Sequence, residues 1–313
     1  MIIFSSPKPR QAETEADQIS SFRSWRRQFP NARICIFGDR STWEDIILEL
    51  GLEFAGRLPA GPVGGEDISF LFRKISDEAK DSLAIYLNSD ILLNDSASQV
   101  VSVLEKIPSP WLASSRRCRV AAWQGPALKS KEQWEKFFTQ VREGGQWGEA
   151  YSLDIFLFRG LCFADMPPFL IGHSGWDNWI IYSNRMKGIN VIDVSADLSV
   201  IHCDHGYSYA QGNSDPTRRD GALEKYNQGK AGSEDKLFHL GHATHELRNG
   251  TMLPRRNWSL RMRNLQLWEI RFPRQRWWWL PLRRVFHPIW KRWLAWTIKE
   301  ENWNCRTTKI PFR

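Results

Sequence analysis

The sequence of 313 residues lacks the features that mark several common classes of protein. It has no run of about 18 uncharged apolar residues, so it predicts no membrane-spanning helix. The N-terminus, MIIFSSPKPRQ, has no basic region followed by a long apolar run, and it therefore predicts no signal peptide. We find no internal repeat. With 42% hydrophobic and 25% charged residues, the composition is that of a globular protein rather than a disordered one.

The sequence also has few cysteines and no close pair of them. Its five cysteines are widely spaced, and no two form a CxxC motif. An odd number of scattered cysteines argues against a disulfide framework, and the missing CxxC argues against a zinc knuckle. A reducing cytosol is the simplest interpretation of this pattern.

Charge is distributed unevenly along the chain, although the formal net charge is +8. Residues 251–313 contain 15 Lys and Arg, 3 Asp and Glu, and 9 of the 17 Trp, while residues 1–250 contain 28 basic and 32 acidic residues. The sequence therefore predicts a mildly acidic globular body followed by a basic, Trp-rich segment.

Short apolar runs alternate with amphipathic stretches over the first 200 residues, a pattern typical of a largely parallel sheet covered by helices. Predicted strands span residues 1–4, 33–37, 83–87, 111–120, 154–158, 191–194 and 198–203. Predicted helices span residues 16–29, 41–50 with Ser41 as cap, 67–79 with Asp67 as cap, 96–107, 131–141 and 176–186. The Gly/Ser/Asp-rich stretch at 211–235 predicts a loop or linker, where the alternation stops.

Polar side chains follow the clearest buried strand, at 83–87. In an open α/β sheet, ligands bind outside the carboxyl ends of the strands, and Asn88-Ser89-Asp90 falls there. One carboxylate and one amide suit a hard divalent cation that bridges a diphosphate. Taken alone, the tripeptide favours the alternative that Asp90 caps the following turn.

Four landmarks occur in order over about residues 1–210: Phe4-Ser5-Ser6-Pro7-Lys8-Pro9, Tyr86-Leu87-Asn88-Ser89-Asp90-Ile91, Gly172-His173-Ser174-Gly175-Trp176-Asp177-Asn178-Trp179, and Ile201-His202-Cys203-Asp204-His205. With them the chain resembles glycosyltransferase-like proteins of the GT-A fold, in which a D-x-D or related motif follows the fourth strand and holds the metal of a nucleotide sugar. The resemblance implies an α/β fold with a mostly parallel sheet flanked by helices. It divides the chain into a core at 1–210, a loop-rich segment completing the active site at 211–250, and a basic, Trp-rich helical extension at 251–313.

The resemblance also implies where the nucleotide sugar binds. The loop after the first strand cups the base and ribose in such proteins, and Asp39 could accept a hydrogen bond from either. The implied donor contacts are Phe4, Ser5, Ser6, Lys8, Asp39, Arg73, Asn88 and Asp90. Alternatives remain for several of these residues: a Pro-rich turn with a solvated Lys8, a Gly-Asp turn at Asp39, and a solvated helix face at Arg73.

Asp177 is the candidate general base by the same resemblance. A carboxylate between two Trp is partly desolvated, which should raise its pKa toward a value useful for removing a proton from an acceptor hydroxyl. Trp176 and Trp179 offer flat apolar faces for an acceptor sugar. The alternative is that Asp177 is an N-cap and that both Trp are core anchors.

The implied metal is Mn²⁺ or Mg²⁺, held by Asp90 and by either His202 or His205. Many GT-A motifs carry two acids where this chain has Asn88 and Asp90, so metal-independent turnover stays open. A second run of histidines, at His239, His242 and His245, is structural first and a metal or phosphate site second.

The sequence thus predicts a nucleotide-sugar-dependent, inverting glycosyltransferase that acts on a glycan or a lipid-linked acceptor. A sugar nucleotidyltransferase is an alternative, but its Gly-rich loop is missing after the first strand, and the only Gly cluster is at 61–65. A non-catalytic surface-binding protein is a third. The Trp and basic residues at 251–313 predict peripheral binding to an anionic membrane, at its cytoplasmic face. Packing on the body is the next alternative, and nucleic acid is disfavoured because no RNA-binding signature accompanies them.

Overall fold

The computed structural model describes residues 1–204, 221–232, 236 and 238–272. Within these ranges, no helix has the length and apolar character that crossing a bilayer would need. The described cysteines, Cys35, Cys118, Cys162 and Cys203, are all free thiols, and all but Cys162 are buried.

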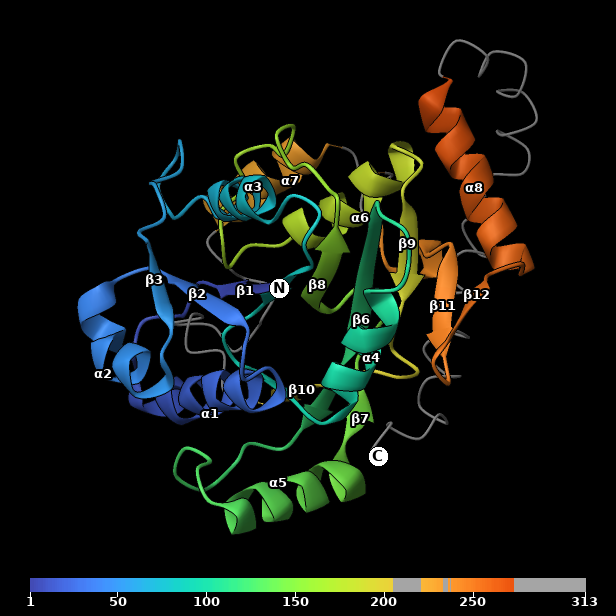
Figure 1. Ribbon diagram of the computed structural model, residues 1–313. Helices are drawn as coiled ribbons and strands as arrows, with labels where there is room; N and C mark the ends of the chain where they lie inside the picture. The colour runs from blue at the N-terminus through green and yellow to red at the C-terminus, as the bar shows by residue number, and fades with distance from the viewer. Residues whose placement is uncertain (205–220, 233–235, 237, 273–313) are drawn as a thin grey trace.

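A 12-stranded sheet forms the centre of the molecule, and its main path runs β12-β11-β9-β6-β8-β4-β1-β2-β3 (Figure 1). Along this path β8 is antiparallel to both neighbours and the β11–β12 hairpin is antiparallel, while all other pairings are parallel. The strands are β1 (Ile2–Ser5), β2 (Arg33–Phe37), β3 (Glu53–Gly56), β4 (Ala84–Leu87), β5 (Ile91–Leu93), β6 (Trp111–Val120), β7 (Gln146–Trp147), β8 (Leu153–Arg159), β9 (Asn190–Asp193), β10 (Val200–Cys203), β11 (His245–Arg248) and β12 (Thr251–Pro254).

Helices cover both faces of this sheet (Figure 1). Side chains of β4 alternate between two core clusters, with Tyr86 on one face and Ile85 on the other, as expected of a strand buried on both sides. The first face packs against α3 (Ile68–Ala79), α6 (Trp176–Met186) and α7 (Gly221–Ala231), and the second against α1 (Ala12–Gln28), α2 (Arg40–Leu50) and α4 (Ser96–Leu104). The predicted class, an α/β fold with a mostly parallel sheet flanked by helices, is confirmed.

Two predictions about local structure are corrected by the structure. Helix α2 begins one residue before Ser41, because the carboxylate of Asp39 is the cap and accepts from the backbone N–H of Ser41 at 3.1 Å. The stretch at 211–235 is not only a loop, since α7 lies within it, and β11 and β12 extend the sheet beyond the point where the alternation was expected to stop. The predicted cap of α3, Asp67, is confirmed.

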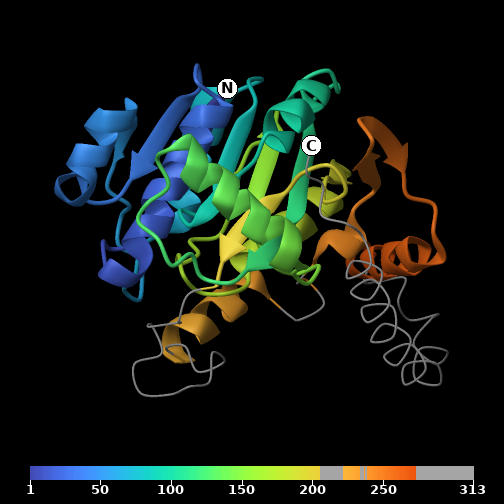
Figure 2. The ribbon, with the colours of Figure 1, turned by 90° about the horizontal axis from the view of Figure 1, so that it is seen from below.

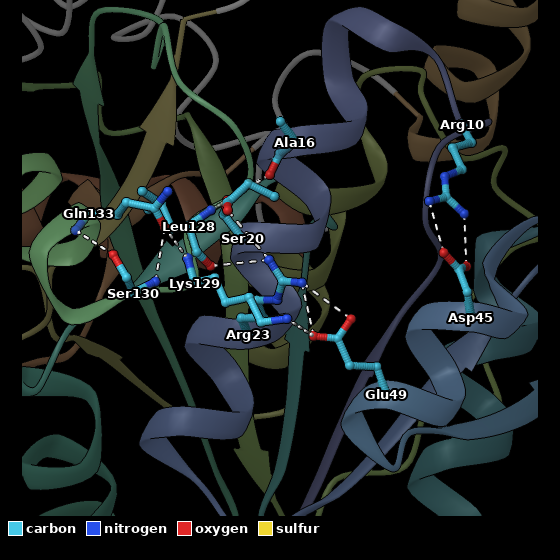
Figure 3. A network of polar contacts seen from close by, with 11 residues as sticks. Arg10, Ala16, Ser20, Arg23, Asp45, Glu49, Leu128, Lys129, Ser130 and Gln133 are labelled. Carbon is cyan, nitrogen blue, oxygen red and sulfur yellow. Dashed lines mark hydrogen bonds and ion pairs between the residues drawn. The ribbon is translucent and has the colours of Figure 1, made fainter.

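Helix α5 (Lys131–Gly144) lies outside the main layers, nearest the viewer in Figure 2. It packs with β6 and β10 around a small third cluster that includes Phe137 and Ile201. The segment before it is tied to α1 by polar contacts (Figure 3): Ser20 accepts from the N–H of Leu128 at 2.8 Å, and Arg23 donates to the carbonyl of Leu128 at 3.4 Å. Arg23 also donates to Glu49 of α2 at 2.9 Å. These contacts hold the segment before α5 against α1.

Helix α8 (Trp258–Arg271) follows β12 and packs on the short 3₁₀ turn η2 (Leu240–His242). Asn257 caps it by accepting from the N–H of Leu260 at 2.8 Å. Its buried Arg263, 1% exposed, lies with a guanidinium nitrogen 2.9 Å from Nε2 of His239. The predicted helical extension is therefore present over 258–271, and residues 273–313 lie outside the described residues.

Candidate functional site

The carboxyl ends of β1 and β4 lie side by side because the two strands are parallel neighbours, with Phe4 opposite Tyr86. Ser5 donates from Oγ to the carbonyl of Leu87 at 2.6 Å, which holds the loop after β1 against the end of β4. Nζ of Lys8 then lies 2.5 Å from Oδ2 of Asp90. Two of the landmarks thus meet at one edge of the sheet.

His202 reaches the same carboxylate from a different strand. It lies on β10, opposite Ile91 in an antiparallel pairing with β5, the strand that begins directly after Asp90. Nε2 of His202 lies 3.6 Å from Oδ2 of Asp90, and both side chains are nearly fully buried. The structure therefore brings Asp90 and His202 together, while the other candidate, His205, lies outside the described residues.

The pair Asp90 and His202 has the donor set for a divalent cation. With metal–ligand distances of about 2.1 Å, two ligands of one ion lie roughly 3.0–3.4 Å apart, close to the separation observed here. Over the ranges that the structure describes, no group of three or more His, Cys, Asp or Glu side chains could hold a metal. From the described residues such an ion would have these two protein ligands, with oxygens of a ligand or water available to complete its shell.

A buried polar network lies next to Asp90, between the end of β4 and the start of β8, and the sequence did not predict it. The hydroxyl of Tyr86 donates to Oδ1 of Asn88 at 2.8 Å, and Nδ2 of Asn88 donates to Oδ1 of Asp154 at 2.8 Å. Arg117 lies 3.3 Å from the other oxygen of Asp154. Burial, followed by the charges of nearby carboxylates, raises the pKa of Tyr86 well above its usual value, so its hydroxyl keeps its proton.

Asn88 therefore bridges a hydroxyl and a carboxylate, and the geometry of both contacts orients its amide. One lone pair of Oδ1 and one proton of Nδ2 are left for a ligand. Asp154 belongs to the site because β8 runs antiparallel to β4, so its first residues lie beside the last residues of β4. The only sequence signal for it was an acidic residue at the start of the otherwise apolar predicted strand 154–158.

Asp177 lies in the first turn of α6, which begins after Gly175. Gly175 has φ +103°, a left-handed conformation that favours glycine, and it is the N-cap, so the alternative that Asp177 caps the helix is wrong. The pKa of Asp177 is raised to about 6, chiefly by burial and further by the charge of Asp154, against the lowering effect of nearby backbone N–H groups. The predicted rise in its pKa is confirmed.

The two tryptophans beside Asp177 are core residues. Trp176 is 6% exposed, and its ring packs against Phe72, Tyr86 and Phe156. Trp179 is 8% exposed and packs on Phe169. Ring faces that are packed in the core are not accessible to a sugar, so the structure corrects the predicted stacking role and supports the alternative of two core anchors.

Three of the residues predicted to contact the donor, Phe4, Ser5 and Ser6, are buried. The ring of Phe4 is fully buried among Phe72, Tyr86 and Phe158, so only its backbone could meet a ligand. Ser5 and Ser6 are both buried at the end of β1, and Oγ of Ser5 donates to the carbonyl of Leu87.

Asp39 and Arg73 are occupied by structural contacts. Asp39 is exposed, caps α2 and lies 3.3 Å from Arg57, and its bonds with Ser41 lower its pKa. Arg73 donates to Asp67 and to the carbonyl of Met166, both at 3.0 Å. A role for either in binding a nucleotide stays a prediction.

The histidines after residue 238 make structural contacts of their own. His239 accepts from Gly241 at Nδ1, and His242 stacks on Phe238 with ring centroids 3.8 Å apart. Burial lowers the pKa of both imidazoles well below the usual value, and nearby arginines add to the effect. His245 is partly exposed on β11, and burial lowers its pKa as well. The three therefore form no metal cluster within the described residues.

No model of a known protein family matches this sequence, and no curated protein is similar to it in sequence. Similar solved structures include a protein of Desulfovibrio desulfuricans G20 described as a nucleotide-diphospho-sugar transferase, with 15% identity, 73% of this chain and 95% of that chain covered, and a TM-score of 0.40. Glucosyl-3-phosphoglycerate synthase of Mycobacterium tuberculosis, in complex with Mg²⁺ and UDP, has 13% identity, coverages of 74% and 77%, and a TM-score of 0.40.

A third similar structure is CMP:2-keto-3-deoxy-manno-octonic acid synthetase in complex with CTP, with 10% identity, coverages of 74% and 98%, and a TM-score of 0.34. With identities of 15% or less in all three, the chemistry of this chain rests on its own side chains.

Proposed function

We propose that this protein transfers a sugar from a nucleotide-diphosphate donor to a hydroxyl acceptor. The observation that carries the proposal is that two carboxylates with different surroundings, Asp90 just after β4 and Asp177 in the first turn of α6, both lie near Tyr86. Asp90 lies beside the ammonium of Lys8 and the imidazole of His202, whereas Asp177 is held half-buried with a raised pKa. Charges from both acids and from Asp154 act on the hydroxyl of Tyr86, so the three lie around one residue.

On the donor side, Lys8 and Asp90 have complementary roles. The ammonium of Lys8 can bind a phosphate oxygen, and Asp90 with His202 would hold a Mn²⁺ or Mg²⁺ ion. When bound, that ion would neutralise charge on the diphosphate and so stabilise the leaving nucleotide. The backbone of the Phe4–Lys8 loop and the side chain of Asp39 would contact the base and ribose.

On the acceptor side, Asp177 would act as the general base. Its carboxylate would take the proton of the acceptor hydroxyl while the hydroxyl oxygen attacks the anomeric carbon from the face opposite the leaving diphosphate, which inverts the configuration. A pKa of about 6 suits this role, since the group is mostly ionised near neutral pH yet retains some basicity. The acceptor class is a glycan or a lipid-linked sugar.

The proposal is tested by incubating the full chain with a panel of nucleotide sugars, with Mn²⁺ or Mg²⁺, and measuring the release of nucleoside diphosphate. Asp90→Asn should abolish both nucleotide binding in calorimetry and turnover. Asp165→Asn is the matched control, because Asp165 is an exposed aspartate paired with Lys187.

Two outcomes would contradict the proposal. One is the absence of any nucleotide-sugar binding with metal present. The other is production of pyrophosphate from a nucleoside triphosphate and a free sugar, which would indicate a nucleotidyltransferase instead.

A further inference from the structure

Helix α8 has two chemically distinct faces. With 100° between successive residues, Leu260, Arg263 and Leu267 fall within an arc of about 60°. The structure buries this arc: Leu260 is 6% and Arg263 is 1% exposed, and Leu267 packs against the core. Arg263 also contacts His239, so this is the face that holds α8 to the body.

The opposite face of α8 presents large aromatic side chains to solvent. Trp258, Arg261 and Trp268, with Phe272 just after the helix, fall within an arc of about 80°. Trp258 is 64% exposed, Trp268 is 39% and Phe272 is 41%, and Arg261 is exposed as well. These three aromatic residues are among seven large hydrophobic residues of the described chain that are exposed. Their concentration on one helix face marks an interaction surface.

Charge on this surface is of one sign. Arg261 lies on this face, and Arg256 and Arg271 are exposed at the two ends of the helix, whereas the other two arginines of the segment, Arg255 and Arg263, are turned toward the protein. Residues 253–272 contain one acidic residue, Glu269. A basic helix with tryptophan on its outer face has the composition that lies in the interface of an anionic membrane, where aromatic rings sit at headgroup level.

The position of α8 in the fold leaves this face accessible. Figures 1 and 2 both place α8 at the same end of the molecule as β11 and β12, on the far side from α2. We propose that the outer face of α8, made of Trp258, Arg261, Trp268 and Phe272, is an in-plane binding surface for anionic lipid bilayers. A nucleic acid fits it less well, because on this face three aromatic side chains surround one arginine, and phosphate pairing would require more cations.

The experiment measures co-sedimentation of the full 313-residue chain with phosphatidylcholine vesicles, with and without phosphatidylglycerol. The triple variant Trp258→Ala, Trp268→Ala, Phe272→Ala should reduce the partition coefficient by about tenfold or more, because it removes the apolar area that enters the interface. Changing Arg256, Arg261 or Arg271 to Gln should reduce it about fivefold per residue on anionic vesicles only, with an effect that fades at high salt.

The matched control replaces exposed hydrophobic residues elsewhere on the body. Leu48, Val63 and Tyr151 are 71%, 53% and 50% exposed, and their change to Ala should leave vesicle binding unchanged. Unchanged binding by the α8 aromatic variant would overturn the proposal and would move the membrane contact to residues 273–313. Equal loss in the control variant would overturn it as well. So would an α8 variant that loses self-association or RNA binding while it still binds vesicles. Circular dichroism of each variant separates loss of binding from loss of fold.

Discussion

The ammonium of Lys8 lies 2.5 Å from the carboxylate of Asp90, although the two residues are 82 positions apart in the sequence. The contact exists because the loop after β1 and the loop after β4 leave the sheet at the same edge. It places a monovalent cation against the oxygen that a divalent metal would bind. Lys8 and a metal ion would therefore compete for Asp90 until a diphosphate offers Lys8 a second anion.

This competition predicts that removing Lys8 changes the affinities for nucleotide diphosphate and for metal in opposite directions. Lys8→Met should weaken nucleotide diphosphate binding by about ten- to hundredfold, because it removes a charge-assisted contact worth roughly 1.5–3 kcal/mol. The same change should strengthen binding of Mn²⁺ alone, since Asp90 no longer has an ammonium beside it. Calorimetry with each ligand separately measures both. If both affinities fall together, Lys8 supports the loop rather than competing at Asp90.

Asp177 should control the acid limb of the reaction. The carboxylate form is the base, so turnover should rise with pH through about 6 and then level off. Asp177→Asn should lower turnover by about 10²–10⁴-fold and remove this limb, while donor binding is retained. The pH profile of steady-state turnover and donor calorimetry provide the measurements. Loss of donor binding in this variant would contradict the assignment of the base.

Asp154 should tune Asp177 from the neighbouring strand. Its negative charge contributes to the raised pKa of Asp177, so Asp154→Asn should move the acid limb of the pH profile to lower pH. The same change removes the ion pair with Arg117 and perturbs the bond with Asn88, and it should destabilise the fold by about 1–3 kcal/mol. Urea unfolding measures the stability change. If the variant folds and the acid limb of its pH profile does not move, the charge of Asp154 does not influence the pKa of Asp177.

Stability should fall in mild acid because of His239 and His242. Their pKa values are lower in the folded protein than in the unfolded chain, so the unfolded chain binds more protons below its ordinary histidine pKa of about 6.5. Each histidine should then cost about 1.4 kcal/mol per pH unit as the pH falls below that value.

Asp177 acts in the opposite direction in the same range. Its pKa is raised in the fold, so it favours the folded state as the pH falls through about 6. The two histidines together outweigh this single carboxylate, so net stability should decrease between about pH 6.5 and 5. Urea midpoints across this range should show the decrease, and His242→Gln should make the slope shallower. A midpoint independent of pH would indicate that the imidazoles titrate normally.

Local patterns predicted much of this fold. The ranges of β2, β6 and α6 coincide with the predicted ones, because their periodicity and end signals are contained in the segment itself. The cap Asp67 was likewise visible, since capping involves only residues close in sequence. Asp90 and His202 were found through motifs, and their proximity depends on an antiparallel pairing of β5 with β10.

What the sequence missed depends on long-range pairing. The direction of β8 is decided by its neighbours β4 and β6, and only that direction brings Asp154 to Asn88. The strand β11 is four residues long and gains its order from pairing with β9, so its own composition gave no signal. The tryptophans of α6 were ambiguous for a related reason: apolar and aromatic rings serve a core and a sugar equally well until the neighbours are known.

The short turn at residues 238–242 links two helices that do different work in this protein, α6 and α8. The carbonyl of Phe238 accepts from Asn178, the residue after Asp177, and His239 contacts Arg263 on α8. This turn thus connects α8 to the start of α6, the helix that carries Asp177. A displacement of α8 would therefore act on Asp177, on the acceptor side of the site, more directly than on Asp90 and Lys8 on the donor side. Binding of α8 to a membrane should therefore change the KM for the acceptor or kcat. The affinity for the donor should stay as it is in solution.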